Sequence, residues 1–201
     1  MTSVISTSMI KRILCIIVFA TLSAPVIQQL RAADGVTDAD ALAKESEDYC
    51  TSTAQTRPTP PDVIVAKVNE ACALLEKEGR AAFPKFSGKG SPFIYEGTYV
   101  SVHSLADCTT LVHPLKPKMV GNQLTSLKDA KGKRFYITED DLVRTKGEGW
   151  VEYYWPKPGS QEIARKITFV KKCKLPDGTE VVVCSGMSNF SDADAAKLEL
   201  H

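Results

Sequence analysis

GEGWVEYYWPKPGSQEIARKITFVK, residues 147–171, is the segment from which the architecture of this chain is predicted most directly. Two runs rich in aromatic and β-branched residues, 150–155 and 163–170, flank a loop of Pro, Gly and Ser at 156–160. This order is typical of a β-hairpin, because large and branched side chains favour strands while Pro and Gly favour turns. The segment therefore predicts two adjacent antiparallel strands.

The first strand of this hairpin carries aromatic rings on both faces. Side chains alternate across a strand, so Tyr153 and Trp155 share one face and Trp150 lies on the other. A sheet with rings on both faces must cover both, and we expect one face to form the wall of a cavity. Lys166 on the partner strand adds a cation, a combination that suits a small anion. Ordinary packing of the rings, with Lys166 in solvent, is the alternative interpretation.

The rest of the chain supplies a helix and more strands. Apolar residues at three- and four-residue spacing predict an amphipathic helix at 61–79 that ends at Gly79. All neighbouring strands can be joined antiparallel, so we predict an α+β fold with a long N-terminal helix packed on a five-stranded antiparallel sheet. The predicted strands are 93–103, 108–112, 150–155, 163–172 and 179–186.

The N-terminus has the pattern of a secretory signal peptide. Lys11 and Arg12 precede an apolar run at 13–22, and the small residue Ala32 offers a cleavage position. The run is shorter than the roughly 20 residues needed to cross a bilayer, which favours a cleaved signal over a retained anchor. We therefore expect residues 1–32 to be removed and the mature protein to be periplasmic or secreted.

Three segments follow the predicted signal peptide. Residues 33–60 are polar, contain a short helical pattern and end in a cluster of prolines that breaks any helix running into it. Residues 61–190 contain the predicted helix and sheet and form one domain of ordinary size. Residues 191–201 form a short C-terminal tail.

Export makes disulfide pairing the default for the cysteines that remain after Cys15 is removed with the signal peptide. Cys173 and Cys184 flank a predicted turn on adjacent strands, and Cys50 and Cys72 lie on two predicted helices. These are the two candidate pairs, although spacing does not fix the connectivity. No C-x-x-C or Cys/His cluster in the sequence has zinc-ligand spacing, so no metal site is predicted.

Composition and motifs argue against several classes of function. The net charge of +1 and the lack of a basic arm in the sequence argue against nucleic acid as a partner. The GEG at 147–149 lacks the spacing and following helix of a nucleotide-binding loop. The sequence contains no recognisable nucleophile elbow, catalytic carboxylate pair or Cys/His pair, so we predict neither enzymatic activity nor a cofactor.

A series of short motifs follows the predicted helix in a definite order. They are LVHP at 111–114, PKMVGNQL at 117–124, DAKGK at 129–133, GEGWVEY at 147–153, WPKP at 155–158, KITFVK at 166–171 and VVVCSG at 181–186. Together with the helix, this series resembles a single-Cache domain, the extracellular PAS-like sensor module of bacterial chemoreceptors and sensor kinases, here in a standalone form. Each motif alone is weak, but the ordered series is fairly specific.

The resemblance implies a ligand pocket on the sheet face opposite the long helix, roofed by the segment between the second and third strands. Members of this family commonly sense small organic acids such as acetate, propionate, pyruvate or lactate. A buried carboxylate needs a charge partner and hydrogen bonds. Lys166 would supply the charge, Tyr153 would donate a hydrogen bond, and Trp150 or Trp155 would form an apolar wall.

Further candidates for the ligand site lie on the first two predicted strands. Tyr99 and Ser101 belong to the first strand, and His113 stands at the end of the second. The ring nitrogens of His113 suit the fixing of a turn as well as contact with a ligand.

Two functional hypotheses result. The preferred one is an exported, sensor-type domain that binds a small organic molecule, above all a short-chain carboxylate, and passes the signal to a partner such as a membrane receptor or kinase. The alternative is a structural or protein-interaction module with a Cache-like fold and no small-molecule ligand.

Overall fold

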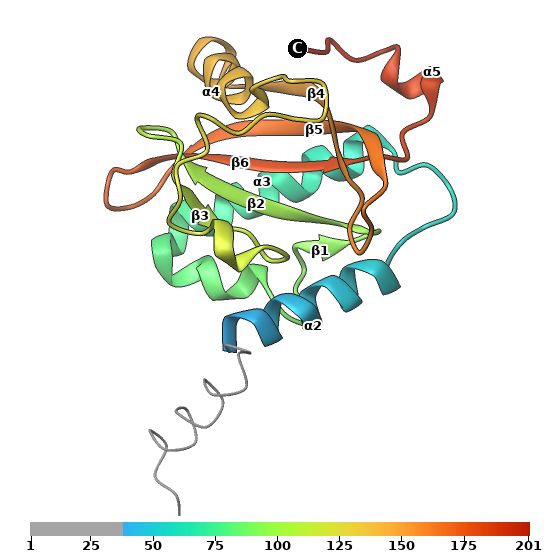
Figure 1. The fold of residues 1–201 in the computed structure, drawn as a ribbon. Coiled ribbons are helices and arrows are strands. Elements are labelled where there is room, and N and C mark those ends of the chain that lie inside the picture. The colour runs from blue at the N-terminus through green and yellow to red at the C-terminus, as the bar shows by residue number, and fades with distance from the viewer. Residues whose placement is uncertain (1–37) are drawn as a thin grey trace, which may run out of the picture. The chain divides into compact units, whose positions relative to one another are not determined.

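One antiparallel sheet organises residues 38–201, the part of the chain that the computed structural model describes (Figure 1). Its strand order is β1-β2-β6-β5-β4, and β3 pairs with β2. The predicted signal peptide, residues 1–32, lies outside the described residues. Within those residues the six strands are β1 (Ile94–Tyr95), β2 (Thr98–Ser104), β3 (Thr110–Val112), β4 (Glu148–Pro156), β5 (Ile163–Lys174) and β6 (Glu180–Met187).

The predicted α+β fold class is confirmed, with one strand more in residues 38–201 than the five predicted. The predicted strand at 93–103 is in fact β1 and β2, because a two-residue turn at Glu96 and Gly97 folds one back on the other. Both turn residues have positive φ, 44° and 77°. This is the conformation of the type I′ turn, whose twist matches that of antiparallel strands.

The hairpin predicted at 147–171 is formed by β4 and β5. Tyr153 faces Lys166 across the strand pair, and Trp155 faces Ala164. Because cross-strand neighbours share a face of the sheet, Tyr153, Trp155 and Lys166 lie on the same face. The loop at the hairpin tip contacts α2 (Asp38–Ser52), since the backbone N–H of Gly159 donates to Glu47 Oε1 at 3.1 Å.

Helices cover both faces of the sheet, and each face has its own apolar core (Figure 1). The predicted helix is α3 (Pro61–Glu78), which buries Ile64 and Leu75 completely against one face. On the other face, α4 (Phe135–Lys146) buries Leu142 and Val143. Burial of one such side chain stabilises the fold by about 1.5–3 kcal/mol. The shorter helices of the described residues are η1 (Gly79–Phe86), η2 (Pro117–Met119) and α5 (Asp192–Ala195).

A disulfide joins Cys72 of α3 to Cys173 of β5, with their Cα atoms 5.7 Å apart. Both predicted pairs, Cys173–Cys184 and Cys50–Cys72, are therefore wrong. Cys173 faces Val181 across the strand pair, three positions from Cys184, and an odd offset places two side chains on opposite faces. Cys50 belongs to α2, lies in a separate apolar cluster with Ile94 and Tyr99, and is a free thiol, as is Cys184.

Candidate ligand-binding site

A small cavity lies between the sheet and the first residues of α4, on the face opposite α3. Its volume is about 20 Å³, room for roughly one water molecule. The sequence predicted seven ligand-site residues, and six of them converge on this cavity. The residues that line it are Tyr99, Ser101, His113, Phe135, Tyr136, Tyr153, Trp155, Lys166, Thr168, Cys184, Ser185 and Gly186.

Lys166 is the cation of this cavity. Its side chain is 8% exposed, and its Nζ lies 4.8 Å from the centre of the Tyr99 ring. Burial lowers the pKa of Lys166 to about 8, because the charged ammonium loses hydration. Within residues 38–201, no carboxylate forms an ion pair with Lys166 and no side chain or carbonyl accepts a hydrogen bond from it. A buried ammonium of this kind still has its donors available for an anion.

The hydroxyl of Tyr153 points to the same space as the Lys166 ammonium. Thr168 Oγ1 donates to Tyr153 Oη at 3.1 Å, and the Tyr153 ring stacks on Phe135 with 4.1 Å between centroids. Burial raises the pKa of Tyr153 well above its usual value, so the phenol stays protonated. Because its oxygen accepts from Thr168, its own proton is free for an acceptor in the cavity.

His113 orients the hydroxyl of Tyr99, which lies at the other side of the cavity. The backbone N–H of Lys116 donates to His113 Nδ1 at 3.1 Å, so the ring proton is on Nε2, which lies 3.3 Å from Tyr99 Oη. Burial, reinforced by the charge of Lys166, lowers the pKa of His113 to about 3 and keeps the ring neutral. His113 thus fixes a turn and also orients Tyr99.

The two tryptophans lie on opposite faces of β4, as alternation predicts. Trp155 lines the cavity, with its ring edge-on to Phe135 at 5.3 Å and Lys116 Nζ 4.9 Å from its centre. Trp150 does not line the cavity, so of the two tryptophans offered by the sequence Trp155 is the one on the cavity face. Its ring packs in the α3 core, 5.1 Å from the Phe169 ring.

The sequence analysis missed the residues that roof the cavity. Phe135 and Tyr136 come from the first turn of α4, which the sequence analysis left as part of the long segment between strands. The adjacent aromatic pair after Gly132 is the signal that could have identified them. Thr168 and Gly186 were also missed, although their position on strands with known alternation predicts that they share the face of Lys166.

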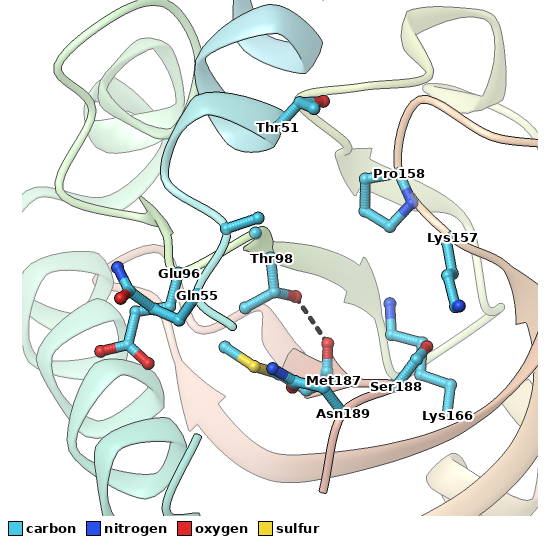
Figure 2. Close-up of a pocket in the computed structure, with 13 residues that line it drawn as sticks. Thr51, Gln55, Glu96, Thr98, Lys157, Pro158, Lys166, Met187, Ser188 and Asn189 are labelled. Carbon is cyan, nitrogen blue, oxygen red and sulfur yellow. Dashed lines mark hydrogen bonds between the residues drawn. The ribbon is translucent and has the colours of Figure 1, made fainter. Parts of the chain in front are cut away.

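A larger cavity adjoins the small one at Lys166, which lines both (Figure 2). Its volume is about 270 Å³, close to the lower end of the range for small-molecule sites. It lies where the chain after α2, the β4–β5 loop and the end of β6 meet. Its labelled lining residues in Figure 2 are Thr51, Gln55, Glu96, Thr98, Lys157, Pro158, Lys166, Met187, Ser188 and Asn189.

An antiparallel sheet with a helix on one face and a roofed pocket on the other defines a PAS-like sensor domain. Residues 84–188 match the family model of the Cache domain, and the chain belongs to that family. This confirms the family to which the series of sequence motifs pointed.

Individual relatives agree with the assignment. A segment of 64 residues is 31% identical to the methyl-accepting chemotaxis protein McpP of Pseudomonas putida strain KT2440; it covers 32% of this chain and 12% of that protein. A Cache chemosensory domain solved as a structural basis for carboxylic acid recognition has a TM-score of 0.51 and 23% identity, with 76% of this chain and 99% of that one covered. A methyl-accepting chemotaxis protein from Vibrio parahaemolyticus has a TM-score of 0.50 and 18% identity, covering 64% and 85%. The two solved structures establish a shared fold.

Proposed function

We propose that this protein is an exported sensor domain that binds a small organic molecule through a carboxylate held by Lys166. The observation that carries the proposal is a buried lysine that forms no ion pair and donates no hydrogen bond among residues 38–201. Burying an unpaired ammonium is costly, and an anionic ligand removes that cost. The P. putida relative is a chemotaxis protein, and the Cache domain solved for carboxylic acid recognition shares this fold, which supports the proposal.

The ligand is a short carboxylate rather than a large acid. Lys166 supplies the charge, and the hydroxyls of Tyr153 and Tyr99 supply hydrogen bonds to the carboxylate oxygens. The rings of Trp155 and Phe135 form the apolar wall for a short carbon chain. Because the small cavity holds only about 20 Å³, binding of such a ligand requires Lys166 or its neighbours to shift toward the larger cavity.

The domain acts by binding and passes the signal to a partner, for which a membrane receptor or kinase is the proposed class. We place it in the periplasm or outside the cell, after removal of residues 1–32. Among residues 38–201, every helix falls short of the length or hydropathy needed to cross a bilayer. The site needs no catalytic step, because its groups pair with and enclose an anion.

A thermal-shift panel of short mono- and dicarboxylates tests this proposal. A ligand at about a hundred times its dissociation constant stabilises the folded state by roughly 2.7 kcal/mol. We expect a short monocarboxylate to raise the melting temperature, and Lys166→Met to abolish the rise. Lys171→Met is the matched control, because Lys171 lies on the same strand but faces away and pairs with Glu148.

Two results contradict the proposal. One is a panel in which no carboxylate shifts the melting temperature, which favours the alternative of an interaction module whose cavity is filled by its own side chains. The other is a shift that Lys166→Met and Lys171→Met reduce equally, which reveals a non-specific effect of charge.

A further inference from the structure

A second group of reactive side chains reaches the small cavity through Cys184 and comes from three elements far apart in sequence. His103 comes from β2, Glu139 from α4 and Cys184 from β6, and their exposed fractions are 2%, 1% and 4%. One donor atom of each lies within 4.8 Å of the others. Because only the fold brings the three residues together, no spacing motif in the sequence predicts the group.

Two distances within this group, both from Cys184 Sγ, fit the edges of a metal coordination tetrahedron. His103 Nδ1 lies 3.7 Å from Cys184 Sγ, and Cys184 Sγ lies 3.6 Å from Glu139 Oε2. With zinc–sulfur bonds of about 2.3 Å and zinc–nitrogen or zinc–oxygen bonds of about 2.0–2.1 Å, a tetrahedral site has sulfur-to-nitrogen and sulfur-to-oxygen edges of roughly 3.5 Å. Only small movements are needed to bring the three atoms around one ion.

Asp140 orients the imidazole for this role. His103 Nε2 lies 2.8 Å from Asp140 Oδ1, so Nε2 carries the proton and the lone pair of Nδ1 points toward Cys184 and Glu139. The ring of Tyr136 meets His103 edge-on at 5.2 Å and limits its rotation. A histidine whose other ring nitrogen donates to a carboxylate is the usual arrangement of a metal ligand.

The donor atoms of the group also suit a cation. The hydrogen bond that the structure gives the Glu139 carboxyl comes from the Cys184 thiol, a weak donor. A divalent cation that displaces the protons of the thiol and the carboxyl would be balanced by the resulting thiolate and carboxylate.

We propose that His103, Glu139 and Cys184 bind a Zn²⁺ ion, with Asp140 as the positioning residue of His103. Nitrogen, sulfur and oxygen donors in one tetrahedral set are typical of zinc. Three protein ligands leave a fourth position for water or an exogenous ligand. Because Cys184 also lines the small cavity, the ion lies beside that cavity.

An alternative trio, His103, Cys108 and Asp140, shares the histidine. Its Asp140 oxygen lies 2.8 Å from Nε2, a hydrogen-bond distance that is shorter than the roughly 3.3 Å edge between nitrogen and oxygen ligands of zinc. The distances therefore favour the trio that contains Cys184. The two cysteines allow an experiment to choose between them.

Cobalt substitution tests the proposal on the purified protein, handled without oxygen and without reductant so that the Cys72–Cys173 disulfide stays intact. After treatment with a chelator, Co²⁺ should bind with one ion per chain and give a sulfur-to-cobalt charge-transfer band, and Zn²⁺ should displace it. We expect Cys184→Ser to lose the band and Cys108→Ser to keep it. Asp140→Asn should keep the band and weaken Zn²⁺ affinity about 10–100-fold.

Glu139→Gln keeps the proposal testable if Cys184→Ser fails to fold. It retains the sulfur ligand and the shape of the side chain but loses a charged ligand, so the band should remain and the affinity fall at least tenfold, while circular dichroism stays native. Absence of stoichiometric Co²⁺ binding overturns the proposal, as does loss of the band in Cys108→Ser. The cobalt band reports metal binding and the thermal-shift panel reports carboxylate binding, so failure of one proposal is distinguishable from failure of the other.

Discussion

Lys166 is the buried cation of the small cavity, which five aromatic residues and a neutral histidine also line. Its position opposite Tyr153 in the hairpin follows from strand register alone. Burial and the charge of Lys166 keep His113 neutral, so Lys166 supplies the positive charge among the residues that line the small cavity.

The lowered pKa of Lys166 predicts how carboxylate binding depends on pH. The folded protein holds this pKa at about 8, below the ordinary value of 10.5, so the ammonium is charged at pH 7 and loses its proton as the pH rises through 8. We expect the affinity for a carboxylate to be nearly constant from pH 6 to about 7 and to fall by up to roughly tenfold per pH unit above 8. Isothermal titration calorimetry at a series of pH values measures this.

The same shift has the opposite sign for the stability of the free protein. Between about pH 8 and 10.5 the unfolded chain binds more protons than the folded one at Lys166, so this group makes stability rise with pH in that window. Lys166→Met should remove both effects. A carboxylate affinity that is flat from pH 7 to 10 would show that Lys166 is not the partner of the anion.

Much of the candidate site could be predicted at this scale. Alternation along β4 and the charge of Lys166 were sufficient to select Tyr153 and Lys166 and to place Trp155 on the same face as Tyr153. The choice between Trp155 and Trp150 needed the structure, because both faces of β4 are aromatic and the sequence does not state which one α3 covers. His103 was not recognised as part of a metal group, since its partners lie on α4 and β6.

At the scale of elements, β5 and β6 pack so closely at Gly186 that no side chain fits there. A Cβ added to Gly186 would lie 2.5 Å from the backbone oxygen of Ile167 and also meet Thr168 Oγ1. Both neighbours belong to the strand that carries Lys166. The absence of a side chain at Gly186 therefore allows β6 to pair closely with β5, the strand that carries Lys166.

Gly186→Ala is expected to destabilise the protein by about 1–3 kcal/mol, because overpacking displaces backbone rather than a mobile side chain. Urea denaturation measures the free energy of unfolding. Gly149→Ala is the matched control: its added Cβ meets Leu142 Cδ2 at 2.8 Å, the end of a flexible side chain, and we expect a smaller loss. Equal losses at the two positions would contradict this account of the β5–β6 contact.

The elements themselves were unevenly predictable. The hairpin at 147–171 and the helix α3 are encoded by strong local patterns, and the structure confirms both. The turn at Glu96 was missed because Glu-Gly is a weaker hairpin signal than Asn-Gly or Asp-Gly. The cysteine pairing was wrong because connectivity depends on which face of a strand meets which helix, and no local pattern contains that information.

At the scale of the whole molecule, the two faces of the sheet differ: one holds the core that stabilises the fold, and the other holds the candidate ligand site. The face toward α3 is filled by an apolar core and locked by the Cys72–Cys173 disulfide. The face toward α4 carries the polar and charged groups around Lys166 and His103. Substitutions in the first core are therefore expected to change stability more than ligand binding.

The disulfide predicts a large effect on stability, because it closes a loop between residues that are 101 positions apart. Removing a native disulfide typically costs about 2–5 kcal/mol, and in the chain-entropy model long loops give the largest effects. We expect Cys72→Ala/Cys173→Ala to lower the free energy of unfolding by that amount in urea. A reductant should destabilise the unmodified protein similarly and leave the double variant unchanged; continued sensitivity of the variant would point to a different pairing.

This covalent link also decides what happens when the chain is cut. Between Cys72 and Cys173 lie the exposed loops, including the tip of the β4–β5 hairpin beside the larger cavity. A protease that cleaves one peptide bond in this interval leaves two pieces that stay attached through sulfur, so strand β5 remains beside α3. Such a nicked molecule runs as one band on a denaturing gel and separates into two only after reduction, and damage to the rim of the site does not release the strand that carries Lys166.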